Sequence, residues 1–262
     1  MLANLTRLVG YRPLIQSLVA RDLKARYRGS TLGFLWSFLN PLLLLLVYTF
    51  VFSVIPGIRG VDPVFMFCGL LPWSWFSTSL LESSSVLVSG GNLIRKVLFP
   101  AEVLPLVTVI AGLVNFCLGL PILLGFIAFA DRPMLWTDLA WLPVIMLVQL
   151  LFTLGLALLL SALTVHFRDL RDLLANAITL WFFATPILYR LSDVEAAKPG
   201  AAWFMKLNPF AHIALAYQEV LYEPGRYSHW LNLLGVGAGA LALLFFGYFV
   251  FDRLRDTFAE AS

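Results

Sequence analysis

Long apolar runs separated by short polar stretches dominate the chain. A helix needs about 20 mostly apolar residues to cross the hydrocarbon core of a bilayer, and six stretches meet this requirement. They run from about Leu32 to Ile55, Val64 to Val88, Leu104 to Ala130, Leu139 to Val165, Leu173 to Tyr189 and Trp230 to Phe251. The pattern therefore predicts an all-α membrane protein with six transmembrane helices.

The segment before the first predicted span has the pattern of a helix with one apolar side. Asp22 and Arg26 interrupt that side, but they stand four residues apart and can form an ion pair. A basic amphipathic helix at this place is typical of the cytoplasmic membrane surface. Anchoring to anionic lipid and docking of a soluble protein both fit the pattern. The residues on the apolar side are Leu14, Ile15, Leu18, Val19 and Leu23.

The connection before the last span, residues 190–229, is too long and too apolar for a simple loop. Ala201–Leu207 and Pro209–Tyr222 are rich in aromatic and apolar residues, and the pair Asn208-Pro209 separates them. Proline disfavours a helical conformation of the residue before it. We expect two short re-entrant or interfacial helices on the outer side; the alternative is a loop lying on the surface.

Composition narrows the class of protein further. Apolar residues make up 60% and charged residues 13% of the 262 positions, whereas soluble domains have about 45–50% and about 25%. This excludes a water-soluble enzyme and a nucleic-acid-binding protein. No repeat or separate soluble domain is visible. We expect one transmembrane domain over residues 1–262, with an interface helix in 1–31, spans in 32–189, an outer segment in 190–229, and the last span and a tail in 230–262.

We interpret the basic residues behind the net charge of +3 as markers of membrane topology, because Lys and Arg concentrate on the cytoplasmic side of membrane proteins. We expect no nucleic-acid partner. Twelve of these basic residues fall on the side of the N-terminal segment and six on the opposite side. We therefore expect a multi-pass protein of the cytoplasmic membrane with both termini in the cytoplasm. The six on the outer side are Arg59, Arg132, Arg190, Lys198, Lys206 and Arg226.

Catalytic and nucleotide-binding motifs are missing from the sequence. A phosphate-binding loop needs Gly-Lys followed by Ser or Thr, and no lysine of this chain has that context. The three histidines are not grouped with carboxylates at metal-ligand spacing. We therefore expect no catalytic residue, no metal and no cofactor on this chain. The two cysteines, Cys68 and Cys117, lie in apolar runs and are interpreted as small core residues.

A few residues within the spans are candidates for function. Glu82 is a carboxylate within an otherwise uncharged span, and such groups face a bundle interior or water. A substrate pathway, a proton site and a contact with a helix end all remain open for it. Trp181 and Phe183 lie two residues apart, about 200° around a helix, so they face different ways. Either ring can stack on sugars or fill a core.

Three stretches carry a resemblance to a known family. The first runs from Arg21 to Trp36 and continues to Asn40-Pro41. The second is Asn92–Pro100, followed by Glu102-Val103-Leu104-Pro105, and the third is Phe167-Arg168-Asp169 with Thr185–Tyr189 and Leu207–Phe210 downstream. Together they resemble the membrane subunit of ABC-2-type exporters that move polysaccharides and teichoic acids. The resemblance covers essentially the whole chain.

This resemblance implies a homodimer that binds two copies of a separate ATPase, which holds ATP and Mg. A lipid-linked glycan of the O-antigen, capsule or teichoic acid type would leave through a channel between the two permease copies, surrounded by membrane lipids. The residues expected at the ATPase are Arg21, Lys24, Arg26, Arg28, Asn92, Arg95, Lys96, Phe99, Pro100, Arg168 and Asp169. Those expected along the channel are Trp36, Tyr48, Glu82, Trp181, Phe183 and Tyr189.

Two other functions remain as alternatives. One is an ABC-2 permease for a drug or a lipid. The other is a membrane-embedded glycosyl or phosphoryl transferase, which would need a cluster of carboxylates and histidines that the sequence does not offer.

Overall fold

The computed structural model describes residues 10–26, 29–32, 35–54, 62–90, 100–130, 136–167, 169–223, 225, 227–255 and 258. These residues form helices and turns and contain no strand, so the prediction of an all-α protein is confirmed for this part of the chain. The helices are α2 (Arg12–Arg26), α3 (Trp36–Val54), α4 (Pro63–Ser89), α6 (Val103–Phe129), α7 (Trp136–Leu139), α8 (Leu142–His166), α9 (Leu170–Phe183), α10 (Leu191–Ala197), α11 (Pro199–Lys206), α12 (Pro209–Leu221) and α13 (Trp230–Leu254).

Four helical stretches are long and apolar enough to cross a membrane: α4, α6, Thr137–His166 and α13. They have 25 to 30 residues each, so at about 1.5 Å per residue they exceed the hydrocarbon core of about 30 Å. They correspond to the second, third, fourth and sixth predicted spans. The first predicted span contains α3, whose shorter apolar stretch is Phe38–Val51.

The fifth predicted span differs from the structure at its outer end. The prediction continued the helix to Tyr189, but α9 has 14 residues and ends at Phe183. Pro186 has no N–H to donate and disfavours a helical conformation at Thr185, so the chain turns there. A continuous helix to Tyr189 is therefore wrong, and α9 alone is about 21 Å long.

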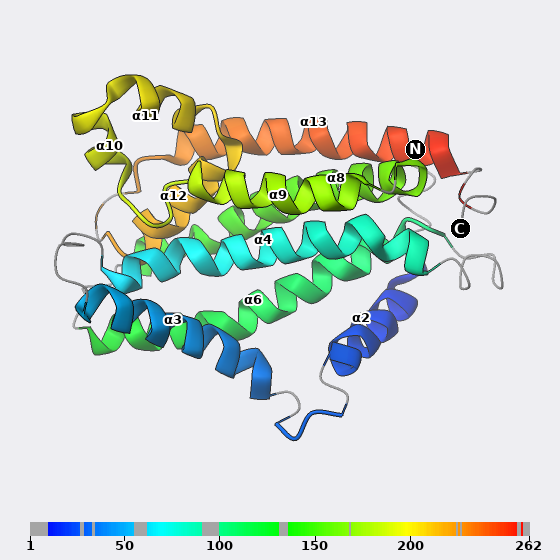
Figure 1. The fold of residues 1–262 in the computed structure, drawn as a ribbon, viewed down its shortest axis with the longest axis horizontal. Coiled ribbons are helices and arrows are strands. Elements are labelled where there is room, and N and C mark those ends of the chain that lie inside the picture. The colour runs from blue at the N-terminus through cyan, green and yellow to red at the C-terminus, as the bar shows by residue number, and fades with distance from the viewer. Residues whose placement is uncertain are drawn as a thin grey trace.

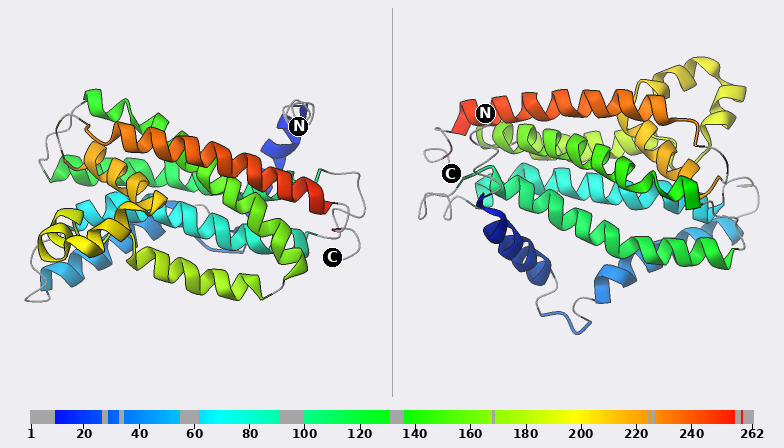
Figure 2. Two further views of the ribbon diagram at one scale, coloured as in Figure 1. Left: turned by 90° about the horizontal axis from the view of Figure 1, so that it is seen from above. Right: turned by 180° about the vertical axis from the view of Figure 1, so that it is seen from behind.

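The long helices run side by side along one axis (Figure 1). The C-terminal ends of α4, α8 and α13 lie at the end of the molecule where α2 begins, and α10, α11 and α12 lie at the opposite end. The central helix is α4, which contacts α3, α6, α8, α9 and α12 and buries Met66, Phe76 and Leu80 completely. Residues 29–32, between α2 and α3, lie away from the bundle (Figure 2).

Two glycines bring α8 and α13 into backbone contact. A Cβ atom on Gly155 would lie 2.8 Å from the backbone nitrogen of Leu244, and a Cβ on Gly247 would meet the carbonyl oxygen of Gly155. Small residues permit this close approach between membrane helices. As a result, α8 and α13 form the most extensive helix pair among the described residues.

The two short helices predicted within residues 190–229 exist as α11 and α12, and α10 precedes them; their location on the outer side of the membrane stays a prediction. Asn208 begins α12 by accepting a hydrogen bond from the backbone N–H of Phe210 at 3.0 Å. Phe210, Ile213 and Tyr217 of α12 are fully buried, so the alternative of a loop lying on the surface is wrong for this segment. The core prediction for the cysteines holds for Cys68 only, because Cys117 is exposed on α6.

Candidate functional site

The apolar side of α2 packs against the first half of α6. Leu18 and Val19 are buried in a cluster with Val103, Val107 and Ala111. Leu14, Ile15 and Leu23 pack at its edge, so all five apolar residues predicted for one side of α2 lie in this contact. Arg21 and Lys24 are exposed. The helix thus presents basic groups outward while its apolar side holds α6.

Arg26 at the end of α2 joins this helix to α4. Its guanidinium donates a hydrogen bond to the Oε2 atom of Glu82 and another to the Oδ2 atom of Asp22 at 2.9 Å. The predicted Asp22–Arg26 pair is therefore confirmed. The side chains of Arg26 and Glu82 are 22% and 40% exposed. Among the three possibilities for Glu82, the structure shows a contact with the end of a helix.

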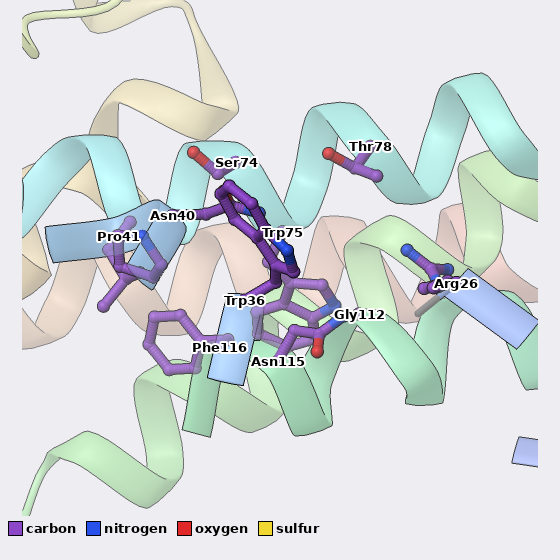
Figure 3. A pocket seen from close by; sticks show the side chains of 11 residues that line it. Arg26, Trp36, Asn40, Pro41, Ser74, Trp75, Thr78, Gly112, Asn115 and Phe116 are labelled. Atoms are coloured by element: carbon purple, nitrogen blue, oxygen red, sulfur yellow. The ribbon is translucent and has the colours of Figure 1, made fainter. Parts of the chain in front are cut away.

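A cavity of about 220 Å³ lies between α2, α3, α4 and α6. Figure 3 shows its lining, to which Arg26 of α2 and Trp36 of α3 contribute together. The structure thus places one residue expected at the ATPase and one expected in the channel on the same cavity. Its polar lining groups come from Asn40, Ser74, Thr78 and Asn115, and its other rings from Trp75 and Phe116.

Gly112 gives the cavity its aromatic wall. A Cβ atom at this position would lie 2.6 Å from the Oγ of Ser79 and 2.7 Å from the Cδ1 of Trp75, so only glycine leaves room for the indole of Trp75. The indole N–H donates to the carbonyl of Val109 at 3.1 Å. Trp36 is held separately, because its N–H donates to the Oγ of Ser30 at 2.9 Å.

The two candidate rings of α9 face different environments. Trp181 packs inward, with its ring centroid 5.2 Å from that of Phe76, and its N–H donates to the Oδ1 of Asn208 at 2.7 Å. Phe183 is 61% exposed. The hydroxyl of Tyr189 donates to the backbone carbonyl of Phe183 at 2.7 Å. Only Phe183 of the two rings therefore lies on the outer surface of this chain.

The exposed face of α9 also carries polar residues. Asp172, Asn176 and Thr179 are exposed, although the side chains of Asn176 and Thr179 donate to carbonyls of their own helix. Polar and charged groups on membrane helices face a bundle interior or a water-filled space and avoid lipid. This face of α9 is therefore a candidate wall of an aqueous path.

A second pocket, of about 270 Å³, is lined by residues of α10, α11 and α12 and of their connections. Arg190 pairs with Glu223 at 3.3 Å, Lys206 with Glu195 at 2.6 Å, and His229 with Glu219 at 2.7 Å. Burial raises the pKa of Glu219, but the hydrogen bonds from Ser228 and His229 lower it by more, so its pKa lies below the ordinary value. These ion pairs connect α10, α11 and α12 with each other and with the start of α13.

Several predicted site residues cannot be compared with the structure. Arg28, Asn92, Arg95, Lys96, Phe99 and Arg168 lie outside the described residues, as does the side chain of Tyr48. Pro100 is half-buried just before α6, and Asp169 is exposed just before α9. Within the described part of the chain, no three His, Cys, Asp or Glu side chains are grouped so that they could hold a metal ion.

Thr78, Trp75 and Asn115 line this cavity but are not among the site residues predicted from the sequence. Asn115 is an amide within an apolar stretch, and this is the signal that could have identified it. Trp75 could not be found in this way, because aromatic residues are common throughout the spans.

Polar groups between membrane helices mark substrate or ion pathways, and this arrangement is typical of membrane transport proteins. The chain is a member of the ABC-2 type transporter family, whose family model matches residues 13–222. Membership in a transporter family separates it from membrane-embedded glycosyl or phosphoryl transferases.

Individual relatives agree with this assignment. An O-antigen export system permease protein RfbA from Myxococcus xanthus is 43% identical over the full length of both chains. A protein of the same name from Klebsiella pneumoniae is 32% identical over 94% of each chain. The polysialic acid transport protein KpsM of Escherichia coli is 24% identical, over 92% of this chain and 93% of its own length.

Proposed function

We propose that this chain is the membrane-spanning permease subunit of an ATP-driven exporter that moves lipid-linked polysaccharide of the O-antigen type across the cytoplasmic membrane. The observation that carries the proposal is the 43% identity, from end to end, to a protein named an O-antigen export permease. Relatives named for a second polysaccharide, polysialic acid, favour glycan over a drug or a simple lipid. The permease makes and breaks no bond in the glycan.

The proposal includes six membrane crossings. Four helical stretches are long and apolar enough to cross a membrane, and α3 and α9 would provide the first and fifth crossings. With 19 residues, α3 is about 28 Å long, and the turn that follows α9 would extend the fifth crossing to the outer surface. The excess of Lys and Arg on the side of α2 supports a cytoplasmic location for both termini.

The conduit would lie between two copies of the chain. Within the described residues, the centre of one copy is filled by α4, with Met66, Phe76 and Leu80 fully buried, and this favours a path between copies. The exposed face of α9, with Asn176, Thr179 and Phe183, would form part of the conduit wall. Leu43, Val47 and Phe50 are exposed on α3 and offer an apolar surface for the second copy. Exposed aromatic rings would give sugars contacts that tolerate different sequences of sugars.

Energy would come from two copies of an ATPase subunit, with ATP and Mg bound there. Arg21 and Lys24 on the exposed side of α2 would contact this partner, together with the cytoplasmic residues predicted from the sequence. When the ATPase closes on ATP, movement of α2 would be passed to α6 through the Leu18–Val19 contact and to α4 through Arg26 and Glu82. The packing of α2 on α6 supports this route.

Deletion of the gene tests the proposed function. In the deletion strain, lipid-linked polysaccharide should accumulate at the cytoplasmic face and disappear from the cell surface, and the intact gene should restore it. Drug susceptibility is measured in parallel to test the alternative. A deletion strain with normal surface polysaccharide and altered drug susceptibility would contradict the proposal.

A further inference from the structure

The amide of Asn208 makes four hydrogen bonds where α9 ends and α12 begins. Its Oδ1 atom accepts from the backbone N–H of Phe210 at 3.0 Å and from the indole N–H of Trp181 at 2.7 Å. Its Nδ2 atom donates to the backbone carbonyl of Ala184 at 3.2 Å and to the Oγ1 atom of Thr185 at 2.9 Å. A side-chain amide offers two donors and two acceptor sites. Asn208 therefore uses its full capacity, with one bond to α12 and three to α9 and the turn after it.

The end of α9 requires such partners. The last carbonyls of a helix have no partner within it, and Pro186 has no N–H to donate to the carbonyl of Phe182. Asn208 binds the carbonyl of Ala184, and Gln218 of α12 donates to the carbonyl of Pro186 at 2.9 Å. Gln218 is 1% exposed. Two amides, one at the start of α12 and one within it, thus hold the turn after α9.

The hydrogen bond from Trp181 is partly shielded from water. Trp181 is half-buried, and its ring centroid lies 5.2 Å from that of Phe76, which is fully buried. Thr185, another partner of Asn208, is also fully buried. A polar group that is removed from water is costly to leave without a partner. Loss of the Asn208 amide would therefore favour a rotation of α9 that brings the indole N–H to another acceptor.

The direction of Trp181 decides which side of α9 looks away from the bundle. Leu174 and Ile178 are buried on the side of Trp181, where α9 packs on α4 and α8. Asn176 and Phe183 are exposed, and Phe183 stands about 200° around the helix from Trp181. Apolar packing is non-directional, whereas a hydrogen bond weakens steeply as its angle falls. The bonds to Asn208 are therefore better suited than the apolar stripe to fix the rotation of α9.

We propose that Asn208 is a positioning residue for transport, which fixes the rotation of α9 so that Asn176, Thr179 and Phe183 face the conduit. The inference rests on the proposed function and extends it, because it names a residue outside the conduit wall that determines what the wall presents to the glycan. Asn208 acts through Trp181 and the turn after α9.

Substitution by serine separates the two roles of Asn208. Serine begins helices about as well as asparagine, so Asn208→Ser keeps the start of α12. Its single hydroxyl, on a shorter side chain, cannot replace the three bonds to α9 and the turn after it. Trp181→Phe removes only the indole N–H and keeps an aromatic ring. Asn232→Ser is the matched control, because Asn232 is exposed in the first turn of α13.

Spin-label EPR of the permease–ATPase complex in lipid nanodiscs measures the rotation. A nitroxide is attached to a cysteine at Ala177 or Thr179, in a chain without native cysteines. Both positions are exposed, and they lie about 100° to either side of the buried Ile178. Collisions of the nitroxide with oxygen report exposure to lipid, and collisions with a water-soluble nickel chelate report exposure to water.

A rotation changes the two reporter positions in opposite ways. Asn208→Ser should lower the collisions several-fold at one position, which turns toward the bundle, and should not lower them at the other. Trp181→Phe should change the same position in the same direction, and Asn232→Ser should change neither. In cells, Asn208→Ser should also reduce surface polysaccharide several-fold at an unchanged amount of membrane-inserted complex.

The outcomes separate the positioning role from the proposed function. A merely structural role would loosen α9 and raise the collisions at both positions. That parallel change, or unchanged collisions, would overturn the positioning role and leave the export function standing. Normal export by Asn208→Ser despite a rotation would overturn its role in transport. If the parent chain itself restores no surface polysaccharide in the deletion strain, the export function is contradicted, and the collision pattern still tests the rotation.

Discussion

Substitution of Arg26 and substitution of Glu82 both break the contact between them, but the two substitutions should lower the free energy of unfolding by different amounts. Glu82→Gln leaves the guanidinium of Arg26 with Asp22 as its partner, 2.9 Å away. Arg26→Gln instead leaves two carboxylates close together without a cation. We therefore expect Arg26→Gln to lower the free energy of unfolding more than Glu82→Gln does.

The structure also gives the size of the effect. A hydrogen bond to a charged group contributes about 1.5–3 kcal/mol, and an exposed ion pair contributes about 0–1 kcal/mol. With side chains 22% and 40% exposed, this pair lies between the two cases. We expect a coupling energy of about 1–2 kcal/mol between the two substitutions in a double-mutant cycle.

Reversible unfolding in mixed micelles of increasing SDS content measures the four proteins of this cycle. Arg21→Gln provides the control, because it removes the same charge from an exposed position of α2 and should not couple to Glu82→Gln. A coupling energy below about 0.3 kcal/mol, or a larger effect of Glu82→Gln than of Arg26→Gln, would refute the reasoning.

Three further predictions concern the conduit, the outer helices and the topology. Phe183→Leu should reduce glycan export at normal expression, whereas Trp181→Leu should mainly lower thermal stability. Normal export by the Phe183 variant would contradict the placement of this ring in the conduit wall. Because the pKa of Glu219 is lowered on folding, its contacts stabilise the protein above about pH 4.5 and weaken as the pH falls below it, so Tm should drop more steeply in acid for the parent protein than for Glu219→Gln. In a background without native cysteines, an impermeant thiol reagent applied to intact cells should label a cysteine at Ala197 but not one at Ala25, and the reverse pattern would refute the six-span orientation.

Sequence patterns predicted those features of the helices that depend only on residues a few positions apart. The apolar side of α2 and its Asp22–Arg26 pair follow from helix geometry over a few residues, and both are present. The helix break at Asn208-Pro209 was predicted for the same reason. The early end of α9 was missed, because hydrophobicity alone was counted across Pro186.

Contacts between distant segments could not be predicted in this way. Glu82 lies 56 residues from Arg26, and nothing in its own span indicates which helix end it meets. The spacing of Trp181 and Phe183 predicted opposite faces, but only the position of α12 determines which ring is inside. The cavity depends on Gly112 leaving room for Trp75, which the sequence does not reveal.

The backbone contact between α8 and α13 also determines which parts of the permease can move. The main chains of α8 and α13 touch at Gly155 and Gly247, so sliding or rotation would bring their backbones into collision, and we expect the pair to move as one body. By contrast, α2 and α3 are joined to the bundle through side chains, which can exchange partners. In the proposed exporter, ATP hydrolysis would therefore move α2 and α3 relative to a stationary α8–α13 unit. A larger residue at Gly155 or Gly247 would separate α8 from α13 and disturb the movements that depend on this unit.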